Sequence, residues 1–220
     1  MSNPGESTWT DLTYPLRPGM PVWPGQPEVS IERIAALSHG DVCNVSVLNL
    51  SVHSGTHLDA PVHFLRDAAD VTTASLDALN GEATVIELIE ETAADGHIRA
   101  AHLEAKSDEI GDATRLIVRT RNSESDWTQD AFREDYAAVA PDAAEWLVAR
   151  GIRTIGVDYL SVAPFDDPTT THCILLDAGV WIIEALDLRA TRAGRIDMRA
   201  LPLVLVGSDA SPIRVVAREI

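Results

Sequence analysis

The sequence predicts a single domain of mixed α/β class with a full hydrophobic core. Its 220 residues fit one large domain, and 45% of them are apolar, which is enough to build such a core. Short segments rich in β-branched residues alternate with helical patterns, but not in strict βαβ order. We therefore expect one domain over residues 1–220, with residues 1–30 forming an extended, proline-rich N-terminal arm.

The N-terminal arm is predicted from its prolines, of which five lie between Pro15 and Pro27. Proline fixes φ and removes an amide donor, so this stretch is expected to be extended, irregular chain. The arm also carries Met20, Val22 and Trp23, which is unusually apolar for a tail. Two interpretations follow: the arm packs over the body of the domain, or Trp23 lines the mouth of a pocket.

The regular elements after the arm are predicted from composition and periodicity. One helix is expected to start at Pro141 and to stop at Gly151, and a second to run from an N-cap at Thr171 to Gly179. Seven short segments have the composition of β-strands: 42–53, 83–90, 115–120, 152–158, 179–186, 202–207 and 213–217.

The charge balance excludes several classes of partner. Acidic residues outnumber basic ones 34 to 17, giving a net charge of −17, which opposes binding to nucleic acids or anionic membranes. A mechanism based on a lysine nucleophile is also disfavoured, because Lys106 is the only lysine. These features favour a protein that acts on a small-molecule substrate.

The location of the protein is predicted from similar observations. No apolar run approaches the length of a membrane span, and the first residues lack the pattern of a signal peptide. Cys43 and Cys173 are too few for a disulfide scaffold. We expect a cytoplasmic protein.

The segment SVHSGTHLDAPVHF, residues 51–64, holds three of the seven histidines. If residues 48–59 run as one strand, the polar positions include His53, His57 and Asp59 on one face, opposite Leu48, Leu50, Val52 and Leu58. Alternate residues of a strand lie roughly 6.6 Å apart, so these side chains can converge. Pro61 is expected to turn the chain and to bring His63 toward the same centre.

This cluster predicts a metal site. Imidazole nitrogens together with a carboxylate suit Zn²⁺, Mn²⁺ or Fe²⁺, and three protein ligands leave a position open for water. His172 and Glu184 are weaker candidates, since each also fits an ordinary structural role when considered alone. Other chemistries lack their motifs: the sequence has no G-x-S-x-G turn, no nucleotide-binding glycine loop and no paired cysteines.

The residues of the cluster resemble a known signature. HSGTHLDAPVHF is similar to the H-x-G-T-H-x-D-x-P-x-H pattern of the cyclase family of metal-dependent hydrolases, which includes bacterial kynurenine formamidase and isatin hydrolase. The resemblance continues in DLTYPLRPGMPVWPG, GVDYLSV, HCILLDAGVWIIEAL and LPLVLVGSDASPIRVV. It therefore extends along most of the chain.

This resemblance implies a swivelling β/β/α-type fold, with a twisted mixed sheet or a barrel-like core and flanking helices. It also implies a homo-oligomer, a dimer or a tetramer, in which loops of one subunit approach the site of its neighbour. His53, His57 and Asp59 match the first metal ligands of the family. His63 matches a residue that is a ligand of a second zinc in some members and a catalytic histidine in others.

His172 and Glu184 have the family spacing of twelve residues and complete a site for two ions in formamidase-like members. The resemblance thus implies one or two ions of Zn²⁺ or Mn²⁺ per subunit. Two positions depart from the pattern of the formamidases: Gln26 stands where aspartate is common, and Thr171 and Cys173 flank His172 where a second histidine is common.

The resulting hypothesis is an arylformamidase-like hydrolase, which cleaves a C–N amide bond of a small aromatic or cyclic substrate by metal-activated water. His63 or Glu184 is expected to move the proton, and Trp23 and Phe64 to line the substrate site. The alternatives are a ring-opening hydrolase of the isatin or cyclic-imide type, a metal-dependent dehydratase or cyclase, and a metal-binding module without catalytic activity.

Overall fold

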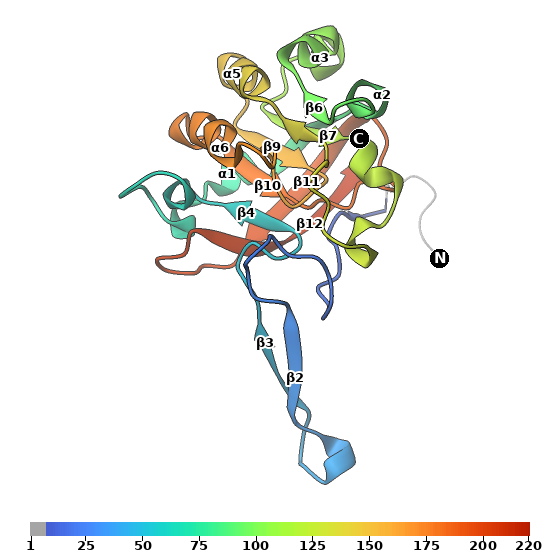
Figure 1. The fold of residues 1–220 in the computed structure, drawn as a ribbon, viewed down its shortest axis with the longest axis vertical. Coiled ribbons are helices and arrows are strands. Elements are labelled where there is room, and N and C mark those ends of the chain that lie inside the picture. Colours follow the sequence, from blue (N-terminus) through green and yellow to red (C-terminus); the bar gives the residue numbers. More distant parts are fainter. Residues whose placement is uncertain (1–7) are drawn as a thin grey trace.

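A computed structural model of the chain describes residues 8–220, so the first seven residues of the expected N-terminal arm lie outside it (Figure 1). The described strands are β1 (Thr10–Asp11), β2 (Ser30–Ala35), β3 (Val45–Asn49), β4 (His57–Asp59), β5 (Gly81–Glu87), β6 (His97–Ile98), β7 (Arg115–Arg119), β8 (Ala138–Val139), β9 (Thr154–Val157), β10 (Trp181–Glu184), β11 (Gly194–Pro202) and β12 (Ala210–Glu219). The α-helices are α1 (Leu76–Leu79), α2 (Ile89–Thr92), α3 (Ala100–Ala105), α4 (Ser107–Ile110), α5 (Pro141–Ala149) and α6 (Pro168–Asp177).

The main sheet closes on itself. Its strand order is β12-β11-β5-β7-β9-β10-β4, and β4 pairs in turn with β12, while β1 adds to the other end of β12. Strands β5, β7, β9 and β10 run parallel to one another, whereas β4, β11 and β12 pair antiparallel with their neighbours. The expected mixed α/β fold is therefore confirmed, and of the two expected cores it is the barrel-like one that forms.

Two apolar cores lie on the two faces of this sheet, because successive side chains of a strand point to opposite sides. In β7, Leu116 and Val118 face the layer of α3, α5 and α6, whereas Ile117 faces the interior of the barrel. The interior is tightly packed at Gly156, where an added Cβ would lie 2.5 Å from Cδ1 of Ile117. This close packing fixes how β9 lies against β7 and β10.

The two predicted helices form, but only one of them begins at the predicted residue. Helix α5 begins at Pro141 as expected, and Gly151, with φ of +79°, follows its end. Helix α6 begins earlier than predicted: its N-cap is Asp167, whose carboxylate accepts the amides of Thr169 and Thr170. The prediction of Thr171 as N-cap is wrong, because its hydroxyl donates to the carbonyl of Val139 from inside the helix.

Two strand predictions are also wrong. Residues 48–59 do not form one strand: β3 ends at Asn49, and a turn over 52–56 with Gly55 at φ of +63° precedes β4. Residues 203–207 form a loop between β11 and β12, whereas the strand there is the segment before it, β11. The alternating pattern Ile196, Met198, Ala200 marks the buried face of β11.

Strands β2 and β3 form a hairpin that projects away from the body of the domain (Figure 1). They pair only with each other among the described strands. We call residues 30–49 the protruding hairpin. Over residues 8–220, which the structure describes, no helix is long and apolar enough to cross a membrane.

Candidate metal centre

Strand β4 supplies the centre of a cluster of polar side chains. His57 pairs across the sheet with Glu184 of β10, and Asp59 pairs with Ile182. Directly opposed residues of antiparallel strands project to the same face, so His57 and Glu184 lie together by register alone. His57 and Asp59 are completely buried, and Glu184 is 3% exposed.

The turn before β4 brings His53 to the same place. Its backbone reverses at Gly55, where an added Cβ would lie 2.7 Å from Cδ2 of Leu16. Thr56 fixes the end of this turn, because its hydroxyl donates to the carbonyl of Ala185 at 2.6 Å and accepts the amide of Tyr14 at 3.0 Å. The glycine between the two histidines is therefore required by conformation as well as by space.

His63 and His172 reach the cluster from two helical segments that follow β4 in the sequence. Pro61 starts a short 3₁₀ helix that ends at His63, which confirms the predicted turn at this proline. The ring of His63 lies 4.0 Å from that of His53 between centroids, and Phe64 stacks on His172 at 4.3 Å. His172 projects from α6, where its Nδ1 lies 2.6 Å from the carbonyl oxygen of Pro168.

The structure thus brings together all six residues that the sequence singled out as metal ligands: His53, His57, Asp59, His63, His172 and Glu184. Asp59 lies in the middle. Its Oδ1 is 3.0 Å from Nδ1 of His53 and 3.5 Å from Nε2 of His57, whereas its Oδ2 is 3.4 Å from Nε2 of His172. The two oxygens of one carboxylate therefore face two different groups of ligand atoms.

The donor set fits a cation. Among the described residues, Nε2 of His57 and both carboxylate oxygens of Asp59 are buried, and no hydrogen bond of regular geometry reaches them. Their polar neighbours are other donor atoms of the cluster, 3.0 to 3.5 Å away. A buried polar atom without a partner costs about 1–3 kcal/mol, and more when it is charged. The Nδ1 of His57 donates to the carbonyl of Gly55 at 2.8 Å, which leaves the lone pair of its Nε2 for a metal ion.

The charges of the centre also favour a cation. Burial alone would lower the pKa of His172, but the contacts of its Nε2 with Asp59 and Glu184 and the charges of both carboxylates raise it to about 10. Burial likewise opposes ionisation of Asp59, yet its contacts with His172 and His53 hold its pKa well below the usual range. Both carboxylates are therefore held as anions that attract positive charge.

His63 has a different environment. Burial is the largest cause that lowers its pKa, to about 4; the negative charge of Asp59 opposes this effect, and the positive charges of His53 and His172 add to it. Its side chain is 24% exposed, which is more than any of the other histidines of the cluster. A neutral imidazole at physiological pH therefore borders the opening of the site.

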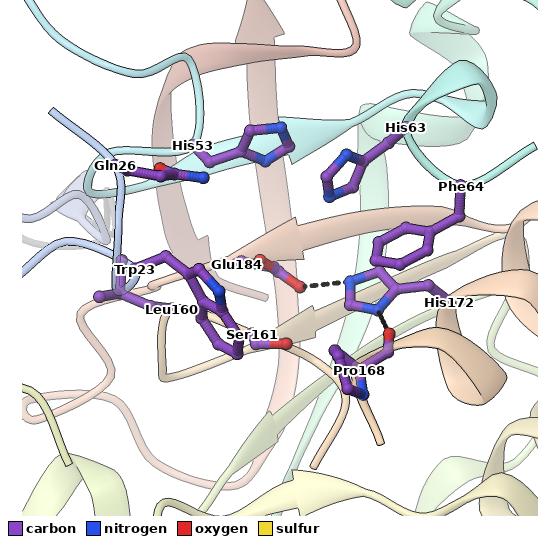
Figure 2. Close-up of a pocket in the computed structure, with 10 residues that line it drawn as sticks. All are labelled: Trp23, Gln26, His53, His63, Phe64, Leu160, Ser161, Pro168, His172 and Glu184. Carbon is purple, nitrogen blue, oxygen red and sulfur yellow. Dashed lines mark hydrogen bonds and ion pairs between the residues drawn. The ribbon is translucent and has the colours of Figure 1, made fainter. Parts of the chain in front are cut away.

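A cavity of about 170 Å³ lies beside the cluster (Figure 2). Trp23 and Phe64 stand on opposite sides of it, as Figure 2 shows. Trp23 makes an edge contact with Phe132 and a tilted contact with Phe165, each at 5.4 Å between ring centroids. The lining residues are Trp23, Gln26, His53, His63, Phe64, Leu160, Ser161, Pro168, His172 and Glu184.

Sequence reasoning missed four residues of this region. Leu160 and Ser161 follow β9 and line the cavity, and the amide of Val162 donates to Oε1 of Glu184 at 2.6 Å. Asp209 directly precedes β12 and lies 2.9 Å from Nε2 of His53. The position of Asp209 after an apolar run and before a strand was a visible signal, but only strand pairing shows what it faces.

Known proteins share both the sequence pattern and the fold. The profile of the family described as "Putative cyclase" matches residues 10–164. A protein named kynurenine formamidase from Erythrobacter litoralis (strain HTCC2594) is 35% identical over 211 residues, which cover 96% of this chain and 93% of that protein.

Two solved structures are similar over almost their whole length. One is described as a predicted metal-dependent hydrolase from Bacillus stearothermophilus, with 32% identity, a TM-score of 0.81 and coverage of 97% of this chain and 98% of that one. The other is an isatin hydrolase bound to the product analogue thioisatinate, with 25% identity, a TM-score of 0.84 and coverage of 97% and 92%.

Proposed function

The chain belongs to the cyclase family, and we propose on this basis that it is a metal-dependent hydrolase of C–N amide bonds. The observation that carries the proposal is the buried donor set around Asp59, in which no hydrogen bond of regular geometry reaches the Asp59 oxygens or the Nε2 of His57 in the described chain. A bound cation would satisfy these buried atoms.

We propose that the ligands are divided between two ion positions. His53, His57 and Asp59 would hold the first ion, and Asp59, His172 and Glu184 would hold the second, so that Asp59 would serve both. The opposite directions of its Oδ1 and Oδ2 support this division. Nitrogen and oxygen donors suit both Zn²⁺ and Mn²⁺, so either metal fits.

The roles of the protein groups follow from their environments. A divalent ion in this site lowers the pKa of coordinated water toward neutrality and polarises a carbonyl oxygen. His63 lines the cavity and is neutral at physiological pH, so it can accept a proton and return it to the leaving nitrogen. Its Nδ1 faces Asp209 at 3.6 Å, which leaves Nε2 as the accepting atom.

Glu184 is less suited to carry this proton. Its Oε1 accepts the amide of Val162, and its Oε2 lies 3.1 Å from Nε2 of His57. Both oxygens are therefore committed inside the cluster, and we assign Glu184 as a ligand.

The substrate is proposed to be a small aromatic or cyclic amide. Trp23 and Phe64 offer apolar walls on both sides of the cavity. Of the residues that line the cavity in the described chain, none is Arg or Lys. This lining favours an uncharged ring, as in an N-formyl arylamine.

A ring-opening reaction of a cyclic amide is the second candidate. It is favoured by the similar structure of an isatin hydrolase, which was solved with the product analogue thioisatinate. The two reactions use the same attack on a carbonyl and differ only in whether the leaving nitrogen stays attached to the product.

Elemental analysis and an activity screen test the proposal. Purified protein is expected to contain Zn or Mn, and after reloading it should hydrolyse N-formylaniline or N-formylkynurenine, or open the ring of isatin. Chelation should abolish the activity, and the same metal should restore it. Protein that binds no divalent metal would overturn the proposal, as would metal-loaded protein that is inactive on every member of a broad amide panel.

We also propose that the protein is a cytoplasmic homo-oligomer built from a single hydrolase domain over residues 1–220. The protruding hairpin supports the oligomer, since an isolated two-stranded hairpin is at best marginally stable in water.

Seven apolar side chains on the protruding hairpin are between 40% and 96% exposed: Ile31, Ile34, Leu37, Val42, Val45, Val47 and Leu48. An apolar groove with Leu48, Leu201 and Ile213 lies at its base. A second copy of the chain would cover both surfaces.

A further inference from the structure

His53 has a carboxylate at each of its ring nitrogens. Its Nδ1 lies 3.0 Å from Oδ1 of Asp59, inside the cluster, and its Nε2 lies 2.9 Å from Oδ2 of Asp209, outside it. Asp209 is not one of the residues that the sequence pattern singles out. Its side chain is 47% exposed, whereas His53 is 8% exposed.

The other two buried histidines of the centre have the reverse orientation. The Nδ1 of His57 and of His172 lie 2.8 and 2.6 Å from the carbonyl oxygens of Gly55 and Pro168. A carbonyl only accepts hydrogen bonds, so both histidines carry a proton on Nδ1 and direct Nε2 inward. His53 directs Nδ1 inward instead, so for Nδ1 to bind a metal ion the proton of the ring has to lie on Nε2.

We propose that Asp209 is a positioning residue that accepts the Nε2–H of His53 and so fixes the tautomer whose Nδ1 binds the metal ion. A carboxylate behind a histidine ligand also makes the imidazole a stronger donor. This inference rests on the proposed metal centre, and it assigns to the loop before β12 a part in building that centre.

The loop is held in place independently of His53. The carboxylate of Asp70 accepts the amide of Gly207 at 2.6 Å, and the carbonyl of Ser208 accepts the amide of Val71 at 3.0 Å. The carbonyl of Asp209 accepts the amide of Ala60 at 2.9 Å, and the next residue, Ala210, pairs with Asp59. Backbone contacts thus place the Asp209 carboxylate beside the strand that carries the other ligands.

The test compares Asp209→Ala with Asp209→Asn and with Asp70→Asn. Asp209→Ala removes the acceptor, Asp209→Asn keeps an oxygen that can accept the same hydrogen bond, and Asp70→Asn loosens the same loop without touching His53. Zn²⁺ affinity is measured by competition with a chromophoric chelator, and unfolding temperatures are measured alongside. Asp209→Ala is expected to weaken Zn²⁺ binding by roughly 10- to 100-fold, Asp209→Asn by less, and Asp70→Asn hardly at all.

The stoichiometry at saturating Zn²⁺ should stay that of the wild type in all three variants. In the loaded wild type, proton NMR should show a slowly exchanging Nε2–H of His53, and Asp209→Ala should lose this signal. Wild-type affinity in Asp209→Ala would overturn the inference. Loss of an ion at saturation would also overturn it, because Asp209 would then be a ligand. Wild-type protein that binds no Zn²⁺ or Mn²⁺ would instead overturn the proposed function.

Discussion

The metal centre and the protruding hairpin are opposite in their burial. At the centre, His57, Asp59, His172 and Glu184 are polar or charged and at most 3% exposed. On the hairpin, Ile34, Leu37 and Val42 are apolar and at least 58% exposed. Each region reverses the usual distribution of residues in a folded protein. Each reversal has a cost that a missing partner would remove: a cation at the centre and a second subunit at the hairpin.

The two regions are neighbours in the sequence, but different strands lie beside them. Residues 45–49 end the hairpin, and His53 begins the cluster four residues later. Strand β3 pairs only with β2 in the described chain, whereas β4 lies between β10 and β12. Burial of a strand is therefore decided by which strands lie beside it.

The largest effect is expected when the centre loses a ligand. His57→Ala removes one of the three donors of the proposed first ion. Because that ion lowers the pKa of water from about 15.7 to about 7, its loss should reduce hydrolysis by about 10³-fold or more. Amide hydrolysis and metal content by elemental analysis measure the effect.

His39→Ala is the matched control, since His39 is an exposed histidine of the protruding hairpin. It should keep full metal content and full activity in the assembled protein. Full metal content and activity in His57→Ala would contradict the assignment of the centre.

A smaller effect is expected when the hairpin loses its apolar surface. Ile34→Asp places a charge at a side chain that is 58% exposed in the single chain. If a second copy covers this position, the change should cost about 2 kcal/mol or more and raise the dimer Kd by roughly 30-fold. Light scattering after size-exclusion chromatography measures the mass across a range of concentrations.

Leu76→Asp is the control for the hairpin, because Leu76 of α1 is 56% exposed and lies on the body of the domain. It should leave the assembly unchanged. A wild-type protein that stays monomeric at high concentration would show that the hairpin needs another partner.

The sequence predicts the centre better than it predicts the strands around it. Six candidate ligands were identified from residue type, spacing and family resemblance, because ligand chemistry restricts the choice to a few side chains. The strand over 48–59 was predicted from alternation alone, which cannot show that Gly55 adopts a positive φ. The apolar run of 202–207 was predicted as a strand, although Val204 and Val206 are 81% and 90% exposed.

Long-range pairing explains what remained hidden. Asp209 reaches His53, 156 positions earlier, because β12 pairs with β4. No local pattern carries that information. Closure of the sheet into a barrel depends on the same pairing, so the sequence left the twisted sheet and the barrel as alternatives.

Two glycines with positive φ provide a direct comparison of the regions. Gly55 at the centre has a left-handed backbone, with φ of +63°. The variant Gly55→Ala would place Cβ 2.7 Å from Cδ2 of Leu16. The backbone costs about 1–2 kcal/mol and the overlap adds roughly 1–2 kcal/mol more. Chemical denaturation should show this loss, and Zn²⁺ affinity should fall because His53 and His57 flank the turn.

Gly40 on the hairpin has a similar backbone, with φ of +89°. In the variant Gly40→Ala, the new Cβ would meet nothing within 4 Å. It should cost only the backbone conformation, about 1 kcal/mol, less the entropy that alanine removes from the unfolded chain. Because the hairpin packs on little else in one chain, that cost should appear as local opening in hydrogen exchange rather than in global unfolding. Zn²⁺ affinity should not change. Equal losses of global stability in the two variants would mean that the hairpin is as firmly integrated as the centre, and that the contrast in burial has no energetic counterpart.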